Sequence, residues 1–343
     1  MRSASCCCCR RCASPSGPSS TGGPAVDESQ PPPIPDPCPA RAPSPHTASS
    51  TSDRTTVTDR PEALDYDPHR VPTRPAATVM LVRDAAASGI EVFMMRRTAA
   101  AVFAASQYVF PGGKVDDADH AVNMEPWCDG RTDASSSGLL QVPAGGLSFW
   151  VAAIRECFEE AGVLLARNTA SDDIISFDDA SVAARFSAYR DEMNAGQLDL
   201  GDLCRREDLR LITDAIGYVS HWITPIGPPR RFDARFFIAR APQAQEPLHD
   251  DNETVESLWV RPSEALDRFR AGNLAMFPPT AANLEFLADH SSADVALASA
   301  VAHGKTPPAV HPKVKANDDG KVVVTLFPGD GGYDAAPDYE VIA

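Results

Sequence analysis

Three glutamates lie within five positions of the segment AIRECFEEAG: Glu156, Glu159 and Glu160. On a helix with about 100° per residue, all three carboxylates fall on one patch. Like charges at this spacing repel, and the negative end of the helix dipole adds to the repulsion. A divalent cation would turn the repulsion into coordination, and carboxylate oxygens are the ligands that Mg²⁺ and Mn²⁺ prefer. The pattern alone leaves two interpretations open: a metal site, and a solvated acidic surface, which is the commoner case for this spacing.

The helix that carries the glutamates is expected to span residues 148–161. Val151, Ile154 and Phe158 fall on the side opposite the carboxylates, so this side is expected to pack on a sheet. Gly162 follows and can adopt the left-handed conformation that ends a helix.

Apolar and β-branched segments flank this helix on both sides and predict strands. Strands are expected at residues 76–84, 90–98, 107–117, 163–166, 216–225, 230–241 and 253–262. Further helices are expected at residues 178–215, 262–272 and 278–290. Strands before and after one helix, without regular alternation, predict an α+β fold with a mixed sheet and helices on its faces.

Composition divides the chain of 343 residues into three parts. Residues 1–60 are rich in Ser, Pro, Thr and Cys without periodicity and are expected to form a disordered tail. The folded domain is expected over residues 74–303, with insertions at about 120–147, read as a loop, and 168–215, read as largely helical. Residues 304–343 form a polar C-terminal extension with one strand-like segment.

The formal net charge of −16 disfavours binding to nucleic acid polymers and to anionic membranes. No segment approaches the roughly 18 apolar residues that span a bilayer. Cys128, Cys157 and Cys204 are far apart, which is typical of a reducing compartment. The N-terminus lacks a clean hydrophobic signal region, and the C-terminus is not a peroxisomal signal. We therefore expect a cytoplasmic protein with a small-molecule partner; the oligomeric state stays open.

The segment RECFEEAGV resembles the second half of the Nudix box, with Arg155 and the three glutamates at the matching positions. Gly113 in FPGGKVDD resembles the glycine that opens this box. An insertion separates Gly113 from Arg155, and the position of the early box glutamate falls on Leu147. Asp116 or Asp117 would be the substitute for that acid.

Residues 74–290 are similar to one branch of the superfamily, the long Nudix hydrolases related to the peroxisomal-type acyl-coenzyme A diphosphatases. The shared features are VFPGG, the interrupted box, a helical insertion after AGVLL, and the segment WITPIGPPRRFDARFFIA. The resemblance implies a Nudix α/β/α sandwich and a pyrophosphohydrolase that uses Mg²⁺ or Mn²⁺. Cleavage of coenzyme A or acyl-coenzyme A would give adenosine 3′,5′-bisphosphate and (acyl-)4′-phosphopantetheine.

The resemblance also implies roles for the box residues. Glu156, Glu159 and Glu160 are expected to hold the metal, and the alternative role of Glu159 is to accept a proton from the attacking water. Arg155 is expected to orient the cluster through ion pairs rather than to touch the substrate.

A catalytic base can come from a distant loop in this superfamily, and Glu253 is the first candidate, followed by Glu256. The alternative for both is a solvated loop acid. Groups available for binding substrate phosphates are Arg96, Arg97, Gly112, Gly113, Lys114, Arg230 and Arg231. For the last two, the alternative is a pair at the sheet edge held by acids such as Asp233.

Two other functions remain open at this point. One is a Nudix hydrolase of a different nucleotide, such as a nucleoside diphosphate sugar, a dinucleoside polyphosphate or an oxidised nucleotide. The other is a Nudix-fold binding module without catalysis, which the interrupted box would suit. The intact trio of glutamates favours the enzyme, since a binding module has little need for three repelling carboxylates.

Overall fold

The computed structural model of the chain describes residues 66–86, 88–98, 106–250, 254–302 and 306–342. The chain divides into two units, residues 1–58 and 59–343, and all of the described residues belong to the second. The tail expected at residues 1–60 and the candidate base Glu253 therefore lie outside the described residues. Among the described residues, no helix is both long and apolar enough to cross a membrane.

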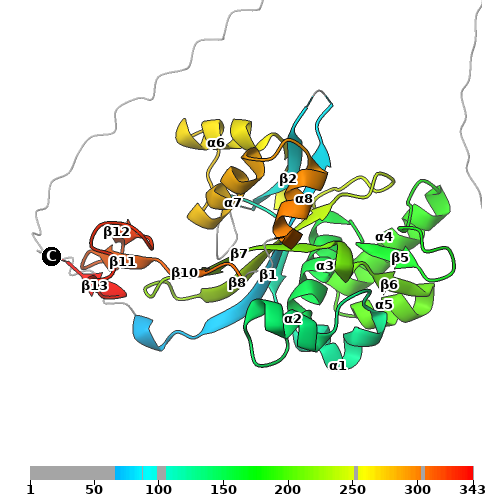
Figure 1. The fold of residues 1–343 in the computed structure, drawn as a ribbon, viewed down its shortest axis with the longest axis horizontal. Coiled ribbons are helices and arrows are strands. Elements are labelled where there is room, and N and C mark those ends of the chain that lie inside the picture. Colours follow the sequence, from blue (N-terminus) through cyan, green and yellow to red (C-terminus); the bar gives the residue numbers. More distant parts are fainter. Residues whose placement is uncertain (1–65, 87, 99–105, 251–253, 303–305, 343) are drawn as a thin grey trace, which may run out of the picture. The chain divides into compact units, whose positions relative to one another are not determined.

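An eight-stranded mixed sheet lies at the centre of the described part of the chain (Figure 1). Its strands are β1 (Thr73–Asp84), β2 (Ile90–Arg97), β3 (Tyr108–Val109), β4 (Gly112–Lys114), β7 (Gly217–Ile223), β8 (Arg231–Arg240), β9 (Thr254–Val260) and β10 (Ala309–Val310). The main path runs β10-β7-β8-β1-β2-β3, while β4 pairs with β1 and β9 pairs with β2. Because β1 is antiparallel to β2 but parallel to β8, the sheet is mixed, as the sequence predicted.

Different helices cover the two faces of this sheet (Figure 1). The helices of the domain are α1 (Ala121–Met124), α2 (Asp133–Leu140), α3 (Leu147–Ala161), α4 (Ala180–Asn194), α5 (Leu200–Glu207), α6 (Pro262–Arg270), α7 (Pro278–Ala288) and α8 (Ala293–Ala302). Alternate side chains of β1 point to opposite faces: Val79 and Leu81 join the core around α3, whereas Met80 and Val82 join the core around α6, α7 and α8. This layering is the α/β/α sandwich that was expected.

The insertion at residues 120–147 was expected to be a loop, but it contains α1 and α2. The sequence of α2 has no apolar periodicity, because this helix packs through small residues. Its backbone lies so close to Gly146 that a Cβ there would be 2.3 Å from the backbone nitrogen of Ser137. Thr132 caps the helix, and the Asp133 carboxylate accepts hydrogen bonds from the backbone of Gly145 (3.0 Å) and Leu147 (3.1 Å). Capping hydrogen bonds and close packing of the backbone therefore stabilise α2, and a search for apolar periodicity does not detect such a helix.

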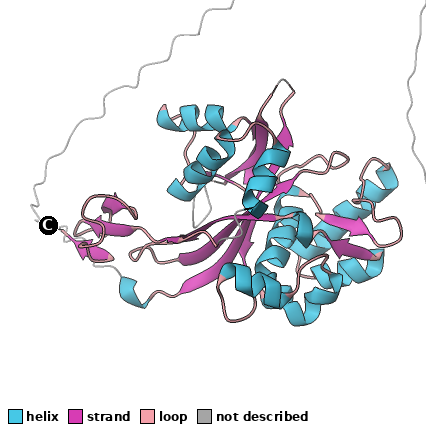
Figure 2. Cartoon of the chain, in the orientation of Figure 1, coloured by secondary structure: helices cyan, strands magenta, loops and turns pink. Residues whose placement is uncertain are grey.

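The second insertion contains α4 and α5, as expected, and also a two-stranded antiparallel sheet. Its strands are β5 (Ala166–Asn168) and β6 (Leu209–Leu211). The C-terminal extension forms a further small sheet, shown in magenta near the C-terminus in Figure 2, from β11 (Lys313–Ala316), β12 (Val322–Leu326) and β13 (Tyr339–Val341). Buried Val314 and Ala316 explain why this polar segment folds.

Candidate metal and active site

Helix α3 positions the three glutamates, and Gly162 ends it with a φ of 69°, as predicted. The core side of α3, with Trp150, Ile154 and Phe158, is fully buried. The acidic side is also covered, since Glu160 is 7% exposed. The alternative of a solvated acidic surface is therefore wrong for this helix.

Arg155 lies at the centre of the acidic cluster and is itself 8% exposed. Its Nε and Nη2 atoms donate to the two carboxylate oxygens of Asp119, each at 2.9 Å. Its Nη1 atom donates to Glu156 Oε1 (2.9 Å) and Glu159 Oε2 (2.7 Å). Nη2 also donates to the carbonyl oxygen of Lys114 at 2.9 Å. The ion pairs expected of Arg155 are present, and its role in orienting the cluster for a metal stays a prediction.

Asp119 is the acid that the sequence analysis missed. In the sequence analysis, counting back from Arg155 placed the early box glutamate at position 147. That position holds Leu147, which is buried at the start of α3. Of the expected substitutes, Asp116 has its Oδ2 atom 3.8 Å from Arg155 Nη2, and the side chain of Asp117 is exposed to solvent. Asp119 precedes the insertion, so counting forward from the Gly-Gly segment would have found it.

Gly112 and Gly113 bring the backbone of β4 against the glutamates. The backbone nitrogen of Gly112 donates to Glu160 Oε2 at 2.9 Å. A Cβ on Gly113 would lie 2.4 Å from Glu156 Oε1, so no larger residue fits without moving that carboxylate. The two glycines were expected to bind substrate. The structure places them at the cluster, where the N–H of Gly112 bonds Glu160 and the absence of a side chain on Gly113 leaves room for Glu156.

The cluster carries more negative charge than its own arginine balances. Burial raises the pKa of Glu156 to about 7, with Arg155 opposing the shift and Glu159 adding to it. Burial also raises the pKa of Glu159. An additional positive charge would therefore stabilise the ionised carboxylates.

The donor set fits a hard divalent cation, because carboxylate oxygens are the ligands that Mg²⁺ and Mn²⁺ prefer. As the side chains stand, no group of three acids, histidines or cysteines in the described part of the chain converges as a metal site. Here the guanidinium of Arg155 hydrogen-bonds both Glu156 and Glu159 and serves as the cation between them. Arg155 Nη1 bonds only Oε1 of Glu156 and Oε2 of Glu159, so it leaves the second oxygen of each carboxylate for a metal.

Two other predicted residues pair with each other at the edge of β2 and β9. Arg96 Nε donates to Glu256 Oε2 at 2.8 Å, and the Tyr108 hydroxyl donates to Glu256 Oε1 at 3.1 Å. The hydrogen bond from Arg96 lowers the pKa of Glu256. Glu256 is therefore a poor general base. Arg97 follows on β2, and its backbone nitrogen donates to the carbonyl oxygen of Gln107.

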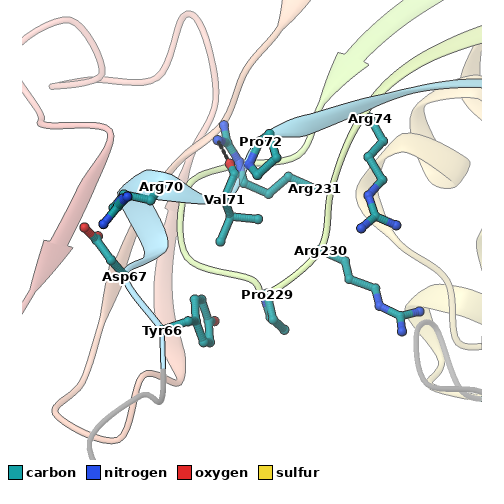
Figure 3. A pocket seen from close by; sticks show the side chains of 9 residues that line it. All are labelled: Tyr66, Asp67, Arg70, Val71, Pro72, Arg74, Pro229, Arg230 and Arg231. Atoms are coloured by element: carbon teal, nitrogen blue, oxygen red, sulfur yellow. Dashed lines mark hydrogen bonds between the residues drawn. The ribbon is translucent and has the colours of Figure 1, made fainter.

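The remaining predicted cations lie elsewhere. The side chain of Lys114 pairs with Asp116 at 2.5 Å. Arg230 and Arg231 line a cavity at the start of β1, shown in Figure 3. The alternative in which Asp233 holds them is wrong, because Asp233 pairs with His221 and Arg235 instead.

Comparison with known proteins shows which sequences and folds this chain resembles. Residues 130–287 match the family model described as the NUDT19 Nudix domain. The acyl-coenzyme A diphosphatase NUDT19 of Xenopus laevis is 27% identical over 224 residues, which cover 56% of this chain and 58% of the relative. The protein of the same name from Gallus gallus is 28% identical over 242 residues, covering 59% and 62%. The chain thus spans less than two thirds of these two relatives.

Two further proteins extend the comparison. The putative nudix hydrolase 7 of Caenorhabditis elegans is 28% identical over 262 residues, which cover 76% of this chain and 74% of that protein. A crystal structure of a NUDIX hydrolase from Alicyclobacillus acidocaldarius has 26% sequence identity and a TM-score of 0.53, and the match covers 70% of this chain and 100% of that chain. The chain has the Nudix fold. It resembles the acyl-coenzyme A diphosphatase branch of the Nudix hydrolases, which confirms the resemblance read from the box.

Proposed function

We propose that the protein is a Nudix-type pyrophosphohydrolase that cleaves the diphosphate of coenzyme A or acyl-coenzyme A. The observation that carries this proposal is the covered acidic cluster, in which Glu156, Glu159 and Glu160 lie against the glycines of β4 and around Arg155. Burying repelling carboxylates is costly, and a protein that only binds a ligand gains nothing from them. The products would be adenosine 3′,5′-bisphosphate and (acyl-)4′-phosphopantetheine.

Glu156, Glu159 and Glu160 would hold Mg²⁺ or Mn²⁺. When bound, the metal neutralises phosphate oxygens and lowers the pKa of a bound water. Arg155 holds Glu156 and Glu159 in place, and the backbone nitrogen of Gly112 does the same for Glu160. Glu159, whose pKa burial raises, is suited to accept a proton from the attacking water.

A general base other than Glu159 would come from the acidic segment before β9, and Glu253 is the candidate there. Glu256 is set aside because Arg96 and Tyr108 hold its carboxylate. Small-molecule substrates and a cytoplasmic location stay predictions from the sequence.

A substrate panel with Mg²⁺ or Mn²⁺ tests the proposal. Coenzyme A, acetyl-coenzyme A, a nucleoside diphosphate sugar and a dinucleoside polyphosphate are each incubated with the wild type and with Glu160→Gln. We expect adenosine 3′,5′-bisphosphate from the two coenzyme A substrates and a loss of at least about 100-fold in the variant. Glu285→Gln, an exposed acid on α7, is the matched control and keeps full activity.

Cleavage of the other nucleotides in preference to coenzyme A would replace the substrate while keeping the reaction. Equal turnover by the wild type and Glu160→Gln, or none by either, would instead favour the binding module.

A further inference from the structure

A cavity of about 390 Å³ lies at the start of β1, beside the loop that joins β7 to β8. Nine residues line it (Figure 3): Tyr66, Asp67, Arg70, Val71, Pro72, Arg74, Pro229, Arg230 and Arg231. Its volume is in the range of small-molecule sites. Four of the nine residues are arginines, which is notable in a chain with a net charge of −16.

Hydrogen bonds fix the walls of this arginine cavity. Buried Arg231 donates through Nε to the carbonyl oxygens of Thr224 and Pro225, each at 3.1 Å, and through Nη1 to that of Val71 at 3.0 Å. The Tyr66 hydroxyl donates to the carbonyl oxygen of Gly227 at 2.5 Å. The loop is thereby joined to the segment before β1, so the cavity is preformed and a ligand would not have to order it.

The other three arginines of the cavity carry charge without a partner. Within the described ranges, the side chains of Arg70, Arg74 and Arg230 make no ion pair or hydrogen bond, and all three are exposed. Figure 3 shows Arg74 and Arg230 extending on the same side of the loop. The acid among the nine lining residues is Asp67, whose carboxylate accepts the backbone N–H of His69 at 3.0 Å. The cavity therefore has an excess of donors suited to a phosphate.

The arginine cavity lies along the same strand as the glutamate cluster. On β1, Ala77 pairs with Gly113, which contacts Glu156, and Arg74 precedes Ala77 by three residues. Three residues of strand correspond to about 10 Å. Because successive side chains of a strand point to opposite faces, Arg74 lies on the face opposite Ala77. A ligand that engages both places would therefore have to pass around the end of the sheet with two well-separated phosphate groups.

We infer that the arginine cavity binds a phosphate group through Arg74 and Arg230. The phosphate is either a remote one on the nucleotide substrate, in which case this inference rests on the proposed function, or a separate phosphate ligand. In both cases the charge-assisted bonds come from the two exposed guanidinium groups, while Arg231 maintains the wall.

Calorimetric titration tests the site without catalysis. Adenosine 3′,5′-bisphosphate and inorganic phosphate are titrated into the full chain carrying Glu160→Gln, with a chelator present so that no metal contributes. We expect binding of the bisphosphate, weakened about tenfold or more by either Arg74→Gln or Arg230→Gln. The matched control is Arg205→Gln, an exposed arginine of α5, which leaves the affinity unchanged. Both cavity arginines lack partners, so the variants are expected to fold, which thermal melting checks.

Kinetics with coenzyme A and with dephospho-coenzyme A, which lacks the 3′-phosphate, separate the two sources of phosphate. If the substrate supplies it, Arg74→Gln raises the KM for coenzyme A but not for dephospho-coenzyme A. If the ligand is separate, neither KM changes, and inorganic phosphate binds as the bisphosphate does. Equal binding of both probes by the Glu160→Gln chain with and without Arg74→Gln/Arg230→Gln, or no binding of either probe, would overturn the inference. The titrations remain valid even if no substrate is cleaved, so the proposed function can fail independently.

Discussion

Asp119 and Arg155 form a buried ion pair that joins the two halves of the interrupted box. Removing one partner leaves the other charge buried and unpaired, which typically costs about 3 kcal/mol or more. We therefore expect Asp119→Ala to lower the free energy of unfolding by about 3 kcal/mol, measured by urea denaturation. Asp117→Ala removes a nearby exposed acid and should change it by less than about 0.5 kcal/mol. Equal effects of the two substitutions would show that Asp119 does not hold the box together.

Gly113 lies so close to Glu156 that an added methyl group must displace the carboxylate. The end of a glutamate side chain can move at little cost, so Gly113→Ala should change stability far less than it changes catalysis. We expect a fall in kcat of at least about tenfold, measured with coenzyme A and Mg²⁺. Gly138→Ala on α2 is the matched control, because a Cβ there meets nothing within 4 Å. An active Gly113→Ala enzyme would mean that the position of Glu156 is not critical.

At the residue level, the part of the site that is local in sequence could be predicted. The spacing of the glutamates, the ion pairs of Arg155 with them and the helix end at Gly162 all follow from one segment of the chain. Asp119 could not be assigned from that segment, because 36 positions separate it from Arg155. Contacts across an insertion depend on the folded chain rather than on helical periodicity.

Helix α4 holds the end of α3 through Arg190, a contact between an inserted element and the box helix. Arg190 donates through Nε to the carbonyl oxygen of Glu159 (2.9 Å) and through Nη2 to those of Glu160 (2.7 Å) and Leu248 (3.1 Å). The carbonyls of Glu159 and Glu160 lie at the negative end of α3, where a cation is favourable. The second insertion thus supports the turn that carries two of the proposed metal ligands.

Replacing Arg190 should therefore affect both stability and activity. We expect Arg190→Met to lower the free energy of unfolding by about 1–2 kcal/mol and to lower kcat. The matched control is Arg185→Met on the same helix, where an exposed arginine pairs with Glu207. Thermal melting and steady-state kinetics measure both effects. If kcat of Arg190→Met equals that of the control, α4 does not position the glutamates.

Asp84 at the end of β1 anchors α8, since its Oδ1 atom accepts the backbone N–H of Ala293 at 2.8 Å. This hydrogen bond and the pairing with Arg240 lower the pKa of Asp84 in the folded state. A lowered folded pKa contributes stability above the unfolded pKa, and this contribution is lost as pH falls through the folded value. The side chain is half exposed, so the contribution is about 1 kcal/mol or less.

The corresponding experiment compares Asp84→Asn with the wild type across pH. We expect the variant to be less stable at neutral pH and the difference to shrink below about pH 4. Urea denaturation at several pH values measures it. A difference that stays constant into acid would indicate that the charge of Asp84 plays no part.

At the level of elements, most strands and the helices with clear periodicity could be predicted. The hairpin of β1 and β2 followed from apolar patterns, and helix α6, which begins at Pro262, followed from proline placement. Helix α2 could not, because its Ser-rich sequence packs through small side chains rather than an apolar stripe. Helix α8 was not predicted either, although Ala293, Ala296 and Ala300 are buried on it, because alanine gives a weak apolar signal.

On the scale of the whole molecule, the contacts of residues 59–343 form one unit. A chain that starts at residue 59 should therefore unfold in one cooperative transition at the melting temperature of the full chain. Differential scanning calorimetry of both forms measures this. A melting temperature lower by several degrees would show that the first unit stabilises the second, and the expectation of a separate tail would fail.

The sequence predicted the layered α+β sandwich but could not order its strands. The parallel pairing of β1 with β8 joins segments about 160 positions apart, and no local pattern specifies that neighbour.

The long insertion that separates Asp119 from Arg155 has a wider meaning. The cost of closing a loop rises only slowly with its length, so the ionic bridge between the two halves can tolerate large changes in the chain between them. A Nudix motif is therefore better defined by which atoms meet than by how many positions intervene. Searches that demand a fixed spacing would overlook other chains whose motif is split in the same way.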